Sequence, residues 1–259
     1  MKYVIPSLKR STILKNRTLK LLEQHNVMPN EIYIFCVKEE VAKYYQELTT
    51  SVGCPYNIIA GKKGIAEQRN FISNYFDENE KIVTIDDDVE EIYSWKSKKK
   101  IVPLKNLKKF IDKCFKIMDK EKTKCCGVYP VKNPFYMNDN YSTNLKFCIG
   151  QFRCFYNIKE IEASRTFNLL EDYEITLKYY LNYGKIIRFN NICLKANYAS
   201  LCGGLNNTDR RYITKTKEVE QFYNSFSIYC FIKDRETDKG PKIDIGLKEK
   251  AGALNIWCD

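Results

Sequence analysis

The stretch KIVTIDDD, residues 81 to 88, places three consecutive aspartates directly after an apolar run. The β-branched residues of that run predict a buried strand that ends at Ile85. Alternate side chains of an extended chain face the same way, so we expect Asp86 and Asp88 to converge and Asp87 to point elsewhere. Two converging carboxylates suit Mg²⁺ or Mn²⁺ and leave coordination positions open for phosphate oxygens. The alternative is a polar turn whose acids cap a helix.

Strands and helices alternate along the chain up to this stretch. The pattern predicts strands over 2–7, 31–37, 56–61 and 81–85, and helices over 14–22, 39–48 and 64–76. Such alternation predicts an α/β fold, with a Rossmann-like, mostly parallel sheet flanked by helices. Ligands bind these sheets at the carboxyl ends of the strands, and the three aspartates lie at that edge.

Composition and charge bound the class of protein. With 259 residues, 44% of them apolar, the chain can bury a sizeable core, and we expect a single domain. A net charge of +11 favours a polyanionic partner or a strongly solvated surface. Eleven cysteines without a CxxC pair, and one histidine (His25), argue against a zinc site or a disulfide framework and favour reduced, buried thiols. No apolar leader or membrane-length apolar run is visible, which predicts a soluble, intracellular protein.

A second motif is GKKGIAEQRN, residues 61 to 70. Glycines between a strand and a helix allow close backbone approach, and the N–H groups at the helix N-terminus can bind an anion. Arg69 follows inside that helix, where its guanidinium could reach a phosphate. An ordinary turn followed by a surface arginine is the alternative.

A third motif is NLLEDYEITLKYYLNYG, residues 168 to 184. It predicts a helix that begins near Glu171 and Asp172 and ends at Gly184. Acids in a first turn are favoured by the helix dipole alone. The functional alternative is a carboxylate presented at the mouth of a cleft as a general base.

The order of these motifs resembles the nucleotide-sugar-dependent glycosyltransferases of the GT-A fold. More narrowly, IPSLKRSTILKNRTLKLL, YIFCVKEE, GIAEQRN and IDDDVEEI are similar to the TET-associated glycosyltransferase family. That family occurs in phages, large DNA viruses and some eukaryotes, and is linked to glycosylation of hydroxymethylated pyrimidines in DNA. The resemblance is close over 2–95 and moderate over 145–205, and it is not visible beyond about residue 212. A viral origin would place the protein in the host cytoplasm or nucleus.

The resemblance implies roles for individual residues. Asp88 would ligate the metal, Asp86 would meet the ribose or the water shell of the cation, and Asp172, with Glu171 beside it, would supply the catalytic base. The third metal ligand is open, because His25 is in the wrong place and Asp209 is a substitute. The residues that bind the donor are Ile5, Pro6, Ser7, Arg10, Gly64, Arg69, Asn70, Asp86, Asp87, Gly203 and Gly204.

These implications combine into one predicted function. A divalent metal, Mn²⁺ or Mg²⁺, assists transfer of a hexose, with UDP-glucose as the expected donor, to a hydroxymethylated pyrimidine in DNA, with inversion. Residues 1–95 form the nucleotide-sugar-binding half and 96–212 the acceptor half of the glycosyltransferase domain, and 213–259 form an extension packed on it. The alternatives are a protein or glycan acceptor, a nucleotidyltransferase, and a non-catalytic nucleic-acid-binding module.

A basic segment, KSKKK at 96–100, favours DNA as the acceptor. Tyr93 and Trp95 beside it could stack on a flipped-out base. Core packing of these rings and a solvated lysine loop are the alternative. The predicted acceptor residues are Tyr93, Trp95, Lys98, Lys99, Lys100, Arg210 and Arg211.

Overall fold

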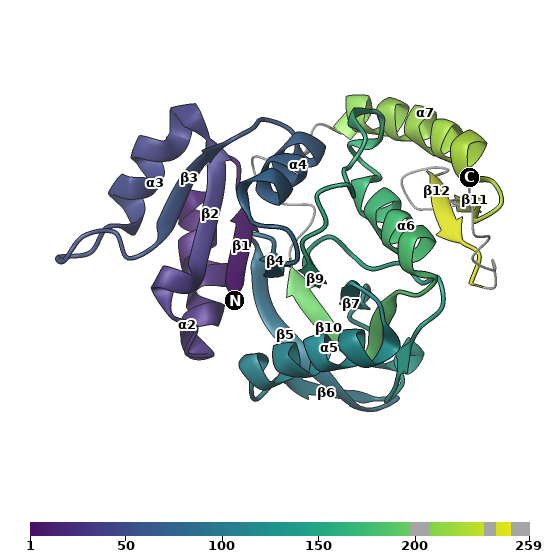
Figure 1. Ribbon diagram of the computed structural model, residues 1–259, viewed down its shortest axis with the longest axis horizontal. Helices are drawn as coiled ribbons and strands as arrows, with labels where there is room; N and C mark the ends of the chain where they lie inside the picture. Colours follow the sequence, from purple (N-terminus) through teal and green to yellow (C-terminus); the bar gives the residue numbers. More distant parts are fainter. Residues whose placement is uncertain (197–207, 236–241, 250–259) are drawn as a thin grey trace.

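The computed structural model describes residues 1–196, 208–235 and 242–249, and it has a ten-stranded sheet as its centre (Figure 1). The strand order is β3-β2-β1-β4-β9-β7-β10-β5-β6, with β8 paired to β10. Only β9, β5 and β8 run against the other strands, so the prediction of a mostly parallel α/β sheet is confirmed. The main strands are β1 (Lys2–Pro6), β2 (Ile32–Val37), β3 (Asn57–Gly61), β4 (Lys81–Ile85), β5 (Val89–Ser97), β6 (Lys100–Pro103), β7 (Cys125–Tyr129), β8 (Tyr141–Ser142), β9 (Phe152–Tyr156) and β10 (Ile187–Ala196).

Helices cover both faces of this sheet. The larger ones are α3 (Val41–Leu48), α4 (Ile65–Tyr75), α5 (Leu107–Glu121), α6 (Glu171–Tyr183) and α7 (Thr208–Phe226). The first crossover is a helix in three parts, α1 (Ser11–Leu14), the π-helical η1 (Lys15–Leu19) and α2 (Lys20–Gln24). Short 3₁₀ turns are η2 (Pro29–Glu31), η3 (Lys38–Glu40), η4 (Pro134–Tyr136) and η5 (Arg165–Phe167).

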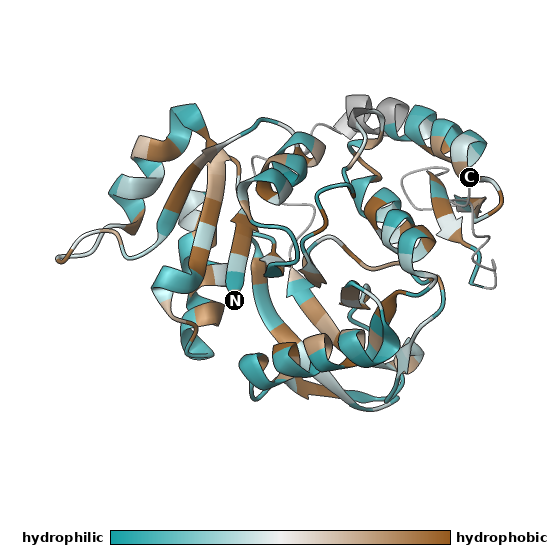
Figure 2. Ribbon diagram, viewed as in Figure 1, coloured by the Kyte–Doolittle hydropathy of each residue, from teal (hydrophilic) through white to brown (hydrophobic). Residues whose placement is uncertain are grey.

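Strand alternation divides the core between the two faces. Tyr3 and Ile5 of β1 pack with Leu14 and Tyr44 of the first and third helices on one face. Val4 packs with Ile72 of α4 on the other. Figure 2 shows the apolar strands between helices of mixed polarity, as expected for amphipathic helices on a buried sheet. The carboxyl ends of β1, β2, β3 and β4 therefore meet at one edge, because these strands are parallel.

The second half of the sheet is joined to the first by β9. This strand lies antiparallel between β4 and β7, and the backbone N–H of Asp86 donates to the carbonyl of Gln151 just before it. The connection brings the residues just before β9, among them Gly150 and Gln151, to the edge where the aspartates lie. The alternation of strands and helices before residue 95 did not predict that an antiparallel strand would lie between β4 and β7.

The C-terminal elements pack on α6. Val219 and Phe222 of α7 share a core cluster with Leu177 of α6 and Cys230 of a hairpin formed by β11 (Cys230–Arg235) and β12 (Lys242–Leu247). Helix α7 passes through residue 212, where the predicted extension was to begin. Within the described residues no helix is both long and apolar enough for a membrane crossing.

Candidate active site

A cleft of about 320 Å³ lies at the carboxyl edge of the first four strands. Its walls come from the ends of β1, β2 and β4, the N-terminus of α4, the residues before β9 and the start of α6. Ten of the predicted site residues line it: Pro6, Ser7, Arg10, Gly64, Arg69, Asp86, Asp87, Asp88, Glu171 and Asp172. The cleft is thus built from segments that lie far apart in the sequence.

The three aspartates form a turn that a buried threonine holds in place. The hydroxyl of Thr18, in the π-helical η1, donates to the carbonyl of Asp86 at 2.7 Å. The same oxygen accepts the N–H of Val89 at 3.1 Å. Thr18 is fully buried, so its side chain ties the two ends of the turn together away from solvent.

The expectation that Asp87 points elsewhere is wrong. Asp87 lines the same cleft as its neighbours, and Arg10 lies 3.4 Å from Asp87 and 3.7 Å from Asp88. The physical reason is that β4 ends at Ile85, so residues 86–88 form a turn and the alternation of an extended strand no longer applies.

Asp87 also ends a buried hydrogen-bond chain. The hydroxyl of Tyr44 donates to the oxygen of Ser7 at 2.7 Å, and the hydroxyl of Ser7 donates to Asp87 Oδ2 at 2.5 Å. Burial raises the pKa of Asp87 to about 6, although the Ser7 hydrogen bond and Arg10 act in the opposite direction. Ile5, predicted to line the donor pocket, is fully buried under these residues and does not border the cleft.

The remaining carboxylates have the features of a cation site. Asp86 Oδ1 and Asp88 Oδ1 are buried and lack a hydrogen-bond partner among the described residues. Burial and the charges of Asp86 and Asp87 raise the pKa of Asp88 to about 7, and burial raises the pKa of Asp86. Carboxylate oxygens that repel each other and accept no hydrogen bond suit a hard divalent cation as ligands. These residues therefore suit Mg²⁺ or Mn²⁺.

The N-terminus of α4 forms the second wall. Gly64 precedes the helix with φ of +96°, a conformation that favours glycine, and it leaves the first turn open to the cleft. Arg69 donates through Nε to Glu171 Oε1 at 2.8 Å and lies 3.6 Å from Asp86 Oδ1. Arg69 therefore connects the acidic turn with the start of α6.

Asn70 does not face the cleft. Its side chain donates to the carbonyl of Ala163 at 2.8 Å and accepts the N–H of Ala163 at 2.7 Å. This paired contact fixes the loop before α6 against α4. The predicted donor contact of Asn70 is therefore replaced by a positioning contact.

The two acids at the start of α6 have different surroundings. Glu171 is buried, and its carboxylate lies between Arg69 and Arg153, at 2.8 and 3.5 Å. Asp172 lines the cleft, is partly exposed, and accepts the backbone N–H groups of Tyr173 at 3.0 Å and Gly150 at 3.5 Å. Burial and the charge of Glu171 raise the pKa of Asp172 to about 7. Asp172 is therefore the acid that can exchange a proton with a ligand, and Glu171 is held in an ion-pair network.

Gly150 permits this crowding. A Cβ at that position would lie 2.8 Å from Arg69 Nη2 and 3.2 Å from Glu171 Oε1. A side chain there would have to displace the ion pair, so glycine is required by close approach.

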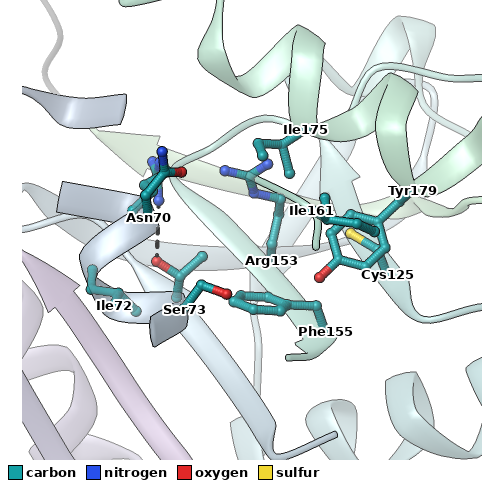
Figure 3. Close-up of a pocket in the computed structure, with 11 residues that line it drawn as sticks. Asn70, Ile72, Ser73, Cys125, Arg153, Phe155, Ile161, Ile175 and Tyr179 are labelled. Atoms are coloured by element: carbon teal, nitrogen blue, oxygen red, sulfur yellow. Dashed lines mark hydrogen bonds between the residues drawn. The ribbon is translucent and has the colours of Figure 1, made fainter. Parts of the chain in front are cut away.

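Arg153 of β9 is the second arginine that contacts Glu171. It extends from β9 into a small cavity of about 50 Å³ between α4 and α6, where Ile161, Ile175 and Tyr179 surround it (Figure 3). Its Nε and Nη1 are buried without a hydrogen-bond partner among the described residues. The cavity is large enough for ordered water, which such nitrogens need.

The predicted acceptor residues lie away from the cleft. The indole of Trp95 donates to the carbonyl of Pro134 at 3.0 Å, and Lys132 lies over the ring of Tyr93 at 4.4 Å. Lys98, Lys99 and Lys100 are exposed at the turn between β5 and β6, and none of these five residues lines the cleft. Arg210 and Arg211 fall in α7 with side chains outside the described part, and Gly203 and Gly204 fall outside the described residues altogether.

A second group of metal-ligand types is buried in the core. The sulfurs of Cys114, Cys126 and Cys154 lie within 4.8 Å of one another, between α5 and the sheet. The group provides three thiols, whereas structural zinc sites take four ligands. It is consistent with cysteines that serve as small apolar side chains.

Sequence reasoning missed Thr18, Tyr44, Gly150 and Arg153. Arg153 carried a signal, because it is a lone charge inside the apolar run FRCFY of β9. The others carried none, because a threonine, a tyrosine and a glycine are ordinary residues in a helix or a turn.

Solved structures show which fold this chain shares. S. aureus TarS 1-349 matches with a TM-score of 0.50 and 13% identity over 86% of this chain and 66% of that chain. The same protein in complex with UDP-GlcNAc matches with a TM-score of 0.51 and 13% identity, over 86% and 67%. The chain thus spans about two thirds of the length of these relatives. The likeness to these structures shows that the chain has a GT-A type fold.

The family is narrower than the class. Residues 1–200 match the TET-Associated Glycosyltransferase family, and the chain belongs to that family. The resemblance read from the sequence motifs is therefore confirmed. No curated protein matches the chain.

Proposed function

We propose that this protein transfers a hexose from a UDP-sugar to a hydroxyl group with the help of a divalent metal. The observation that carries the proposal is that one cleft holds two buried carboxylate oxygens, on Asp86 and Asp88, that accept no hydrogen bond from the described residues, together with the carboxylate of Asp172. A cation can stabilise the departing diphosphate, and a proton acceptor can activate the attacking hydroxyl, so the two groups together suit glycosyl transfer.

The donor lies between the acidic turn at 86–88 and the N-terminus of α4. Its diphosphate faces the N-terminus of α4, where Gly64 leaves the backbone N–H groups accessible. Asp86 and Asp88 hold Mn²⁺ or Mg²⁺, which when bound neutralises the charge that develops on the departing diphosphate. The TarS complex with UDP-GlcNAc supports a UDP-sugar on this fold, and we propose glucose as the hexose.

The proton moves to Asp172. Its carboxylate takes the proton of the acceptor hydroxyl as that oxygen attacks the anomeric carbon from the side opposite the diphosphate. A single base in line with the leaving group gives inversion. Two arginines contact Glu171, and burial together with the charge of Glu171 raises the pKa of Asp172 to about 7, a range suited to a base at neutral pH.

The acceptor we propose is a hydroxymethylated pyrimidine in DNA. The net charge of +11 and membership of the TET-associated family support this choice over a protein or glycan hydroxyl.

The test is UDP release from UDP-glucose with Mn²⁺, measured with DNA that contains hydroxymethylcytosine and with the same DNA unmodified. We expect release only with the modified base, no release by Asp88→Ala, and normal release by Asp234→Asn, which changes an exposed acid on β11. Release that does not depend on the modified base would contradict the proposed acceptor and leave the proposed donor chemistry in place. Full activity of Asp88→Ala would overturn the metal site.

A further inference from the structure

One segment of the chain is strongly basic. Residues 96–113 contain eight lysines and one acid, a net charge of +7. They run from the end of β5 through β6 into the first half of α5. Strand β5 begins beside Asp88 and runs nine residues to the turn before β6, so Lys98, Lys99 and Lys100 lie roughly 25 Å from the acidic turn at a strand rise of about 3.3 Å per residue.

Two exposed aromatic rings lie next to these lysines. Phe135 and Tyr136 of η4 are 62% and 61% exposed, and their rings meet edge to face at 5.1 Å. Burying such rings normally stabilises a fold, so an exposed pair in an ordered turn indicates a binding surface.

The turn that carries the rings is fixed in position. Lys98 donates to the carbonyl of Phe135 at 3.0 Å, and the indole N–H of Trp95 donates to the carbonyl of Pro134. Of the two rings that the sequence indicated, Trp95 thus supports η4, and the ring of Tyr93 lies under Lys132. The available rings belong to Phe135 and Tyr136.

We propose that Lys98, Lys99, Lys100, Lys132, Phe135 and Tyr136, the basic aromatic patch, bind single-stranded nucleic acid outside the catalytic cleft. Lys98 holds η4 in place, the exposed Lys99, Lys100 and Lys132 meet phosphates, and the two rings stack on unpaired bases. Two rings offer little apolar area for insertion into a bilayer, whereas alternating charge and ring faces match a nucleic-acid strand. This goes beyond the proposed transfer reaction, because the patch binds a strand whether or not the cleft modifies it.

The test measures binding of a fluorescent single-stranded oligonucleotide without any sugar donor. Lys99, Lys100 and Lys132 are changed together to Ala, which leaves the Lys98 and Trp95 contacts in place. We expect weaker binding and a salt dependence whose log–log slope falls by about 2, since each phosphate contact to a single strand contributes about 0.7. The matched control changes Lys20, Lys43 and Lys217, three exposed lysines on other elements, and keeps the slope.

A second variant separates stacking from charge. Phe135→Ala with Tyr136→Ala should weaken oligonucleotide binding about tenfold and leave binding of heparin, a polyanion without bases, unchanged. An equal loss for heparin would overturn the stacking, and a lysine variant that behaves like its control would overturn the patch. Binding of anionic vesicles by the patch in place of the oligonucleotide would also overturn the proposal. UDP release by the same variants, measured separately with UDP-glucose and Mn²⁺, reports on the cleft, so a failure of the transfer reaction is distinguishable from a failure of the patch.

Discussion

The two acidic clusters of the cleft differ in how their charge is compensated. In the turn at 86–88, one oxygen each of Asp86 and Asp88 has no hydrogen-bond partner among the described residues. At the start of α6, Glu171 lies between two arginines, whereas Asp172 accepts a backbone N–H group and borders the cleft. The first arrangement suits a cation, and the second suits one proton-accepting carboxylate beside a fixed negative charge. The same residue type thus serves two purposes because its neighbours differ.

The largest expected effect comes from removing the open carboxylate of α6. Asp172→Asn should lower kcat by about a thousandfold, in the range of general base catalysis, because an amide cannot accept the proton. Donor affinity, measured by UDP titration, should stay close to that of the wild type. Retention of most activity would show that Asp172 is not the base.

The pH profile is the control for this assignment. The base must be deprotonated, and burial with the charge of Glu171 raises its pKa to about 7. Wild-type turnover should therefore be complete above pH 7 and fall about tenfold per unit below it, as expected for one essential base. The residual turnover of Asp172→Asn should lack this limb.

A smaller effect is expected from removing one of the two arginines that contact Glu171. Arg153→Met removes one of its two arginine partners in a buried site, and breaking such a pair should lower the free energy of unfolding by about 3 kcal/mol. Urea unfolding measures the loss. Arg153→Lys keeps a positive charge and should recover part of it, so equal stability of wild type and Arg153→Met would contradict the role given to this ion pair.

The smallest effect concerns the support of the acidic turn. Thr18→Val keeps the shape of the side chain but leaves the Asp86 carbonyl and the Val89 N–H without their partner, at a cost of about 1–2 kcal/mol. The concentration of Mn²⁺ that gives half-maximal activity should rise about tenfold, as for other residues that orient metal ligands. Thr18→Ser restores the hydroxyl and should restore the metal response. An unchanged Mn²⁺ response in Thr18→Val would show that the turn does not depend on this contact.

The first half of the fold could be predicted because its signals are local. The strands at 2–7, 31–37, 56–61 and 81–85 match β1, β2, β3 and β4 to within a residue or two, since each is a short apolar run between turn residues. The predicted end of α6 at Gly184 is also confirmed, with φ of +67°. The antiparallel β9 was not predicted, because the pairing of a strand depends on distant partners that leave no periodicity in its own sequence.

The sequence by itself determined the chemistry of this protein, namely an acidic turn after a buried strand, a glycine before an arginine-bearing helix, and an acid pair at a helix start. Residue type and order settle which groups can hold a cation or accept a proton. Only the tertiary structure decided that Asp172 borders the cleft and that Glu171 is held between two arginines. Arg69 and Glu171 are 102 residues apart in the chain, and their contact at 2.8 Å exists only after β9 brings the second half of the sheet against the first. A pKa depends on burial and on charges within a few ångströms, and those distances are properties of the folded chain.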